Sequence, residues 1–166
     1  MAEEITRWGV GLRFALFSII YGAFTIVLRL RYATIFQMNF IPYRILATIG
    51  ITLISIGIPF ELIATVTIHR AFNAGILRTN GAYGLCRHPL YASWVIFLVP
   101  GIIFLTNSWI GLTVPFVMYI LLRILVVKEE KYLEQKFGKE YLDYKKTTPT
   151  VLPIGWLTRK QSKSLC

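Results

Sequence analysis

The sequence predicts an all-α integral membrane protein with about four transmembrane helices and an amphipathic helical segment near its C-terminus. Hydrophobic residues make up 55% of the 166 residues and charged residues only 16%, whereas soluble domains average about 25% charged residues. Four apolar runs approach or exceed the roughly 20 residues that a membrane-crossing helix needs. The stretches between them are too short to build another core in solution, so we expect one membrane domain over residues 1–166.

The first two apolar runs cover residues 10–28 and 41–68. The first is too long for a cleaved signal peptide and no small-residue cleavage site follows it, so a retained helix is expected. The second is longer than one span needs and contains Pro59 and Glu61, which predicts a tilted or kinked helix. An acidic residue inside an apolar run costs roughly 2.5–3.5 kcal/mol on insertion scales. Both a functional role and pairing with Arg70 or His69 remain open for Glu61.

The last two apolar runs, residues 91–105 and 109–127, are joined only by Thr106, Asn107 and Ser108. A connection this short predicts a tight helical hairpin whose two outer ends return to the same side of the membrane.

A charged segment follows the fourth run from Glu129 onward. Its apolar residues recur at spacings of four, four and three, which places them on one face of a helix. They are Leu133, Phe137, Tyr141 and Tyr144. Gly138 is expected to break or bend this helix. The segment is therefore predicted to lie at the membrane surface or to cap the membrane core.

The formal net charge of +10 is interpreted as a topology signal rather than as a nucleic-acid surface. Nine of the 18 Lys and Arg residues fall from Lys128 onward, and basic residues mark the cytoplasmic side of a membrane. The stretch between residues 69 and 88 is also basic, so both segments are expected in the cytoplasm. Arg29 and Arg31 would lie on the opposite side. The expected location is the plasma membrane of a prokaryote or the endoplasmic reticulum of a eukaryote.

The two cysteines, Cys86 and Cys166, predict neither a disulfide framework nor a metal site. Both are expected to be free thiols. Cys166 is the last residue rather than the fourth from the end, so no prenyl anchor is predicted.

Two polar clusters flank the predicted hairpin, one over residues 77–91 and one over residues 129–144. Because the hairpin returns both to one membrane face, they are expected to meet there. Together they offer cations, a ring nitrogen, carboxylates and tyrosine hydroxyls. This set suits a zwitterionic ligand.

The same two clusters carry a set of motifs: Gly81-x-Tyr83-x-x-x-Arg87-His88-Pro89-x-Tyr91, then Glu129-Glu130-x-x-Leu133-x-x-x-Phe137-Gly138-x-x-Tyr141-x-x-Tyr144. In these residues the chain resembles the isoprenylcysteine carboxyl methyltransferase family, and the stretch up to Pro153 is similar to the tail of the eukaryotic members. The resemblance covers about residues 75–153. It implies S-adenosylmethionine bound at the cytoplasmic face and a lipophilic methyl acceptor that arrives from the bilayer.

The resemblance also implies roles for individual residues. The cofactor would contact Gly75, Ile76, Leu77, Arg78, Tyr83, Arg87, His88, Pro89, Leu90, Tyr91 and Glu129. A carboxylate can pair with the cofactor's ammonium group or ribose hydroxyls, and His88 or Arg87 can pair with its carboxylate.

The substrate residue that the resemblance implies is Arg123, as the cation for an acceptor's carboxylate. Eukaryotic members of the family have this arginine four residues before the first glutamate, where this chain has Leu125. Two residues turn a helix by about 200°, so Arg123 can face another direction. No general base is expected for a carboxylate acceptor, because it is already ionised at neutral pH.

Three alternatives remain at this point. A phospholipid or other small-molecule methyltransferase would share the cofactor half, and an amine acceptor would recruit Glu129, Glu130, His88 or a tyrosine as a base. An NADPH-dependent membrane sterol reductase has a similar Arg-His-Pro-x-Tyr segment but a longer chain. A non-enzymatic membrane scaffold leaves the polar clusters unexplained.

Overall fold

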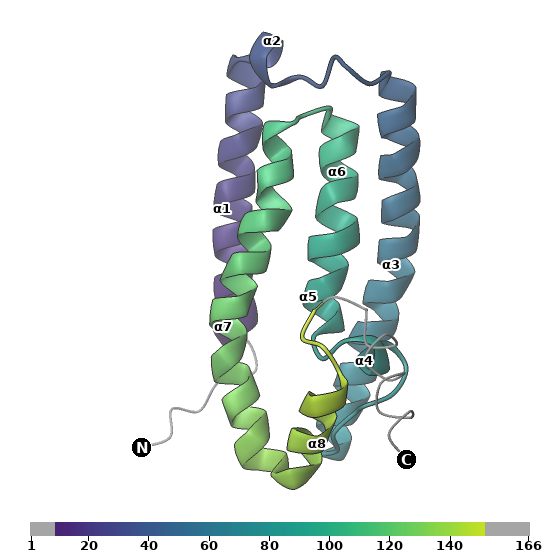
Figure 1. The fold of residues 1–166 in the computed structure, drawn as a ribbon, viewed down its shortest axis with the longest axis vertical. Coiled ribbons are helices and arrows are strands. Elements are labelled where there is room, and N and C mark those ends of the chain that lie inside the picture. The colour runs from purple at the N-terminus through teal and green to yellow at the C-terminus, as the bar shows by residue number, and fades with distance from the viewer. Residues whose placement is uncertain (1–8, 152–166) are drawn as a thin grey trace, which may run out of the picture.

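The computed structural model describes residues 9–151 and folds them into a bundle of long helices (Figure 1). The described residues form no strand; one isolated bridge joins Gln37 to Ser108. The helical elements are α1 (Gly9–Arg31), α2 (Ala33–Phe36), α3 (Tyr43–Ala74), α4 (Ala82–Leu85), α5 (Pro89–Ser93), η1 (Trp94–Leu98), α6 (Val99–Thr106), η2 (Ile110–Leu112), α7 (Thr113–Phe137) and α8 (Lys139–Thr147). Cys166 and the sequence motif beyond Val151 lie outside the described residues.

Four stretches of the described chain are long and apolar enough to cross a membrane, which confirms the predicted number of spans. They are Val10–Arg31, Tyr43–Ala74, Pro89–Thr106 and Ile110–Phe137. Large apolar side chains cover their outer faces, and Ile19 and Leu30 are each 67% exposed. Exposed apolar surface on this scale fits hydrocarbon rather than water as the surrounding medium. The chain is thus a helical integral membrane protein.

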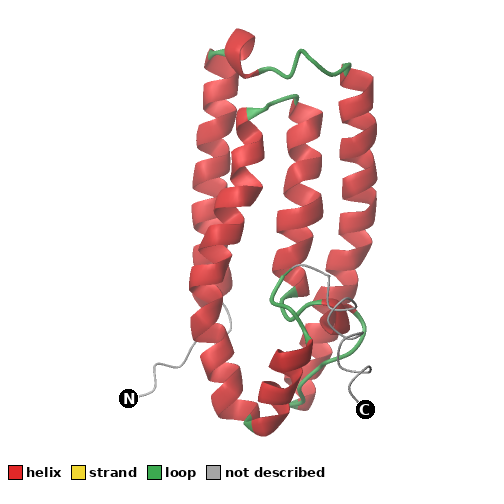
Figure 2. Ribbon diagram, in the orientation of Figure 1, coloured by secondary structure: helices red, strands yellow, loops and turns green. Residues whose placement is uncertain are grey.

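The bundle has two different ends, which Figures 1 and 2 show at the bottom and the top. The loop before α4, the start of α5 and the short helix α8 gather at one end, called the site end below. Helix α2 and the turn between α6 and α7 lie at the opposite end, called the far end. There Asn107 adopts a left-handed conformation with φ 52°, which closes the predicted hairpin turn.

Two spans extend beyond the apolar runs that predicted them. Helix α3 continues six residues past Ile68 and stops at Gly75, whose φ of 65° supplies the left-handed conformation of a helix C-terminus. It remains one helix through Pro59. Helix α7 extends through the first glutamates to Phe137, and Gly138 (φ 53°, ψ −126°) ends it as predicted. The amphipathic segment is therefore the last turns of α7 plus the separate helix α8.

The third span changes its winding partway along. Helix α5 is followed by a π-helical turn, η1, in which the N–H of Val99 donates to the carbonyl of Trp94, and then by regular helix α6. Single π-turns of this kind are frequent at functional sites. Here the turn lies directly after the motif residues of α5.

Small residues let α3 and α6 approach closely. A Cβ atom on Gly50 would lie 2.7 Å from the carbonyl oxygen of Gly101, and one on Gly101 would lie 2.7 Å from a side-chain carbon of Ile54. Close backbone approach at small residues is a principal means of helix association in membranes. These glycines therefore set the distance between the second and third spans.

Gly50→Ala is expected to destabilise the protein because the new methyl group would meet backbone, which cannot rotate away. Overpacking of this kind costs about 1–3 kcal/mol. The matched control is Gly22→Ala in α1, where the added Cβ meets nothing within 4 Å. Thermal unfolding in detergent should show a lower transition for Gly50→Ala only. Equal transitions for the two variants would contradict tight α3–α6 packing.

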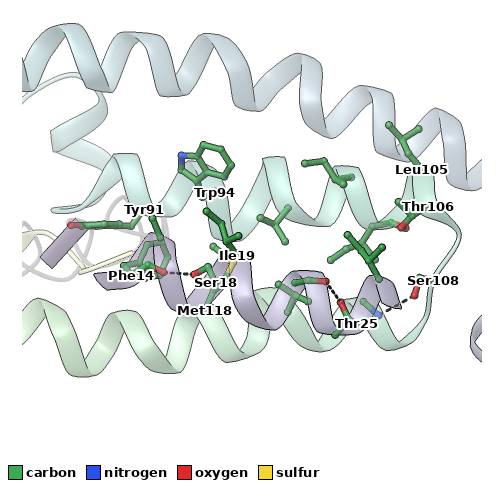
Figure 3. Close-up of a pocket in the computed structure, with 18 of the residues that line it drawn as sticks. Phe14, Ser18, Ile19, Thr25, Tyr91, Trp94, Leu105, Thr106, Ser108 and Met118 are labelled. Carbon is green, nitrogen blue, oxygen red and sulfur yellow. Dashed lines mark hydrogen bonds between the residues drawn. The ribbon is translucent and has the colours of Figure 1, made fainter. Parts of the chain in front are cut away.

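A long apolar cavity of about 710 Å³ lies beside α1 (Figure 3). Its lining runs along α1 from Gly11 to Leu30, which corresponds to about 29 Å of helix. The opposite walls come mainly from α5, η1, α6 and α7, and Figure 3 shows Tyr91 near one end and Ser108 near the other. The cavity therefore spans most of the bilayer's apolar thickness of roughly 30 Å.

Candidate functional site

The two polar clusters predicted from the sequence meet at the site end of the bundle. Arg87, just before α5, pairs with Glu130 on α7, and its Nη2 lies 2.5 Å from Oε1 of the carboxylate. Only 9% of the Arg87 side chain and 10% of the Glu130 side chain are exposed. A buried charge must be paired to be tolerated, so this contact fixes the two clusters together.

Arg87 also holds the end of α8 and the chain that follows it. We call residues 145–151 the C-terminal strap. The guanidinium donates to the carbonyl oxygens of Lys145 and Thr148 and to Oγ1 of Thr150. Backbone bonds add to this, because the N–H of Arg87 donates to the carbonyl of Pro149 at 2.8 Å. The structure thus gives Arg87 internal partners, and its predicted contact with a cofactor stays a prediction.

A second ion pair ties α8 to α7. Lys145 Nζ lies 3.1 Å from Glu130 Oε2 and 2.5 Å from Glu134 Oε1. The hydrogen bond to Glu134 raises the pKa of the Lys145 ammonium above its ordinary value. Glu130 is thereby shared between Arg87 and Lys145. Its neighbour Glu129 has fewer and longer polar contacts.

Glu129 faces the motif residues of α5. Its Oε1 lies 3.7 Å from Nδ1 of His88, and the Tyr91 hydroxyl donates to its Oε2 at 3.4 Å. One third of the Glu129 side chain is exposed, whereas His88 is buried with its Nε2 lacking a hydrogen-bond partner among the described residues. The Nε2 atom lies 3.6 Å from Oε1 of Glu130, so the His88 ring stands between the two adjacent carboxylates.

Buried tyrosines hold α8 and α4 in place. The Tyr144 hydroxyl donates to the carbonyl oxygen of Tyr83 at 2.5 Å, and the Tyr141 side chain is fully buried. Burial raises the pKa of each of these three phenols above its ordinary value. They therefore remain protonated and able to donate at neutral pH.

Cys86 is buried in the hydrophobic core and is a free thiol, as predicted. Burial raises its pKa to about 12. A thiol with so high a pKa is chemically inert, so Cys86 acts as a packing residue.

The predicted cofactor loop follows α3 directly. Gly75 and Gly81 adopt φ angles of 65° and 62°, and a Cβ at either position would meet nothing within 4 Å. Arg78, between them, has a buried Nε with no hydrogen-bond partner in the described part of the chain. Ile76 is exposed and Leu77 is half-buried. The space beside the backbone of Gly75 and Gly81 is therefore empty, and the Nε atom of Arg78 has no acceptor among the described residues.

The apolar cavity reaches this site through α5. Leu90 and Tyr91 line it, whereas Pro89 is fully buried. The ring of Tyr91 packs edge-on against Phe14 of α1 with a centroid separation of 5.1 Å. Since the Tyr91 hydroxyl faces Glu129, one side chain separates the polar site from the cavity.

Arg123 lies apart from these groups. It is exposed on α7 beside the exposed Ile124, and it does not line the cavity, while Leu125 packs against the core. The helix therefore presents Arg123 to the outer face of the bundle. Its predicted contact with an acceptor's carboxylate stays a prediction.

The sequence left the role of Glu61 open between a function and pairing with Arg70 or His69. Glu61 lines the cavity beside Trp94, and its Oε2 is buried without a hydrogen-bond partner among the described residues. An acidic residue inside an apolar run was the available signal, but α3 alone does not tell which face Glu61 occupies. The packing of Ser93 against Gly57, with a hydrogen bond of 3.1 Å, determines that face.

Comparison with known proteins shows to which family the chain is similar. The isoprenylcysteine carboxyl methyltransferase (ICMT) family model matches residues 49–135. Protein-S-isoprenylcysteine O-methyltransferase of Rattus norvegicus is 32% identical over 118 residues, which cover 66% of this chain and 42% of the relative. That of Mus musculus is 38% identical over 78 residues, or 47% of this chain and 28% of the relative.

A plant relative shows the same pattern. Protein-S-isoprenylcysteine O-methyltransferase B of Arabidopsis thaliana is 28% identical over 118 residues, covering 66% of this chain and 60% of the relative. The chain thus spans less than two thirds of the length of each of these three relatives. No solved structure matches it. The family model covers more than half of the chain and both polar clusters up to residue 135, so the chain belongs to the isoprenylcysteine carboxyl methyltransferase family.

Proposed function

We propose that this protein is an S-adenosylmethionine-dependent methyltransferase that esterifies the α-carboxylate of an isoprenylcysteine held in the membrane. The observation that carries the proposal is the meeting of the polar site with an apolar cavity at Tyr91. A hydrophilic methyl donor and a lipophilic acceptor need such a junction. The names of the relatives support the isoprenylcysteine head group.

The residues present fit the proposed cofactor. Glu129, with its partly exposed carboxylate, would hold the ammonium group or the ribose hydroxyls. Arg78, whose Nε has no hydrogen-bond partner among the described residues, and His88, whose ring lies between Glu129 and Glu130, would donate to the cofactor's carboxylate. When bound, the cofactor supplies an electrophilic methyl group on a sulfonium. We place this site in the cytoplasm because the basic residues of α8, among them Lys145 and Lys146, lie at the same end of the bundle.

The remaining residues of the chain position and shield the acceptor. The apolar walls of the cavity would hold the prenyl tail, and the ring of Tyr91 would orient the head group toward the bound cofactor. Methyl transfer to a carboxylate needs alignment rather than a base, because the acceptor oxygen is already ionised. Exclusion of water by the apolar walls keeps that oxygen unsolvated.

The direct test is transfer of a labelled methyl group from S-adenosylmethionine to a panel of acceptors, using the full chain in lipid. We expect methyl ester formation on a prenylcysteine and none on the same cysteine without its prenyl tail. Labelled amine lipids instead would favour the phospholipid class, since Glu61 lines the cavity and would suit an ammonium group. NADPH binding without S-adenosylmethionine binding would contradict the methyltransferase proposal.

Arg123→Ala distinguishes two ways of recognising the acceptor's carboxylate. If Arg123 binds it, as the resemblance implies, the KM for a prenylcysteine should rise while the Kd for the cofactor stays unchanged. Arg13→Ala, which removes another exposed arginine within a span, is the matched control. A KM equal to that of the control would assign the carboxylate to groups that line the cavity.

A further inference from the structure

We propose that Arg29, at the far end of the cavity, binds the phosphate of an anionic phospholipid, with one acyl chain of that lipid inside the cavity. The acyl chain would share the apolar cavity that the proposed function assigns to the prenyl tail, so the two chains would compete for that space. The phosphate site lies at the end of the cavity opposite to Tyr91, and it gives a role to Arg29, one of the two arginines that the predicted topology places on the opposite side.

The far end of the cavity is polar, whereas its middle is apolar. Arg29 lines it together with the hydroxyl residues Thr25, Thr106 and Ser108. The walls toward the middle are formed by residues such as Ile103 and Val114. An apolar passage that ends in a cation and hydroxyl groups matches a lipid, whose hydrocarbon chain is joined to a charged head group.

Arg29 lacks an internal acceptor for its charge. Its Nε atom is buried and has no hydrogen-bond partner among residues 9–151. The acidic residues of this part of the chain begin at Glu61, which lies beside Trp94 near the site end, and the others follow from Glu129 onward. Arg29 as a whole is half-buried and has no ion pair in the described part of the chain, so the anion that balances its charge should come from outside the chain.

The position of Arg29 selects phosphate as that acceptor. It lies in the last turn of α1, near the end of a membrane span and therefore close to the level of the lipid phosphates. A guanidinium binds phosphate through two parallel hydrogen bonds, a geometry that an ammonium cannot match.

The cavity is open to the side, which lets a lipid chain enter from the bilayer. Several of its lining residues are also large exposed side chains, among them Ile26 at 49% and Ile102 at 47% exposed. They come from α1 and α6, so the opening lies between these two helices. A lipid of the adjoining leaflet can then place its phosphate at Arg29 and one chain between α1 and α6.

The test is binding of phosphatidylglycerol and phosphatidylcholine, with identical acyl chains, to the detergent-purified full chain by native mass spectrometry. We expect phosphatidylglycerol to bind more tightly. Arg29→Gln should weaken that binding about tenfold or more, the range for loss of a hydrogen bond between charged groups. Arg31→Gln, an exposed arginine two residues away, should change it less than about twofold.

A second pair of variants tests the acyl chain without altering charge. Gly22 lines the cavity and an added Cβ meets nothing there, so Gly22→Leu should fold and fill the space. It should weaken phosphatidylglycerol binding, whereas Ala23→Leu on the exposed face should not. Equal binding of the two lipids, equal effects of Arg29→Gln and Arg31→Gln, or wild-type binding by Gly22→Leu would each overturn the proposal.

Discussion

Arg87→Ala is expected to cause the largest loss of stability of any single substitution at the site end. The change leaves the buried Glu130 carboxylate without its closest cation and the strap carbonyls without their donor. Removing one partner of a buried ion pair typically costs about 3–5 kcal/mol. Residues 145–151 should then detach from the start of α5.

Cys86 reports this detachment directly. It is fully buried next to Arg87, so maleimide labelling of the folded protein should be slow, and Arg87→Ala should make it fast. The experiment uses a Cys166→Ser background, in which Cys86 is the only thiol. Lys146→Ala, which removes an exposed pair with Asp143, is the control and should leave labelling unchanged. Slow labelling of Arg87→Ala would show that the strap does not depend on this guanidinium.

Glu129→Gln is expected to abolish most of the binding of S-adenosylmethionine while the protein still folds. The substitution keeps the shape of the side chain and removes the charge that the proposed function assigns to the cofactor's ammonium or hydroxyl groups. Loss of a charged hydrogen bond corresponds to a Kd increase of about 10- to 150-fold. Because Glu129 is one-third exposed and makes only long contacts with His88 and Tyr91, folding should survive.

Isothermal titration calorimetry in detergent measures this effect. His88→Ala should also weaken binding, since the proposal assigns its ring, which lies between Glu129 and Glu130, to the cofactor's carboxylate. The control is Glu140→Gln, an exposed carboxylate at the same end of the bundle. Wild-type affinity in both Glu129→Gln and His88→Ala would remove the cofactor from this position, whatever the acceptor proves to be.

The four spans were predictable because each is a long apolar run, and their true ends were not. Helices α3 and α7 continue past the apolar residues until a glycine with positive φ ends them. Hydropathy detects burial in lipid, whereas a helix persists into water as long as its hydrogen bonds continue. Gly138 was predicted as a stop and Gly75 was not, and the sequence does not show that the polar residues before either glycine stay helical.

The meeting of the two clusters was also predictable, since a three-residue turn forces the hairpin to return both to one end. The different partners of the adjacent Glu129 and Glu130 were not predictable from the sequence. Glu129 and Glu130 differ by about 100° around α7, and only the packed structure shows that Glu130 faces Arg87 and Lys145. The outward direction of Arg123 follows from the same rotation, which depends on which face of α7 packs against α1.

The π-helical turn η1 changes the direction in which side chains point along the third span, so α5 and α6 present their residues at different rotations about the helix axis. Below it, Tyr91 faces Phe14 and Glu129; above it, Gly101 meets Gly50 of α3. Each residue added to or removed from a helix rotates everything beyond it by about 100°. The number of residues between Tyr91 and Gly101 is therefore as much a part of the site as their identities. A chain one residue shorter here could keep every motif and still turn Tyr91 away from Glu129.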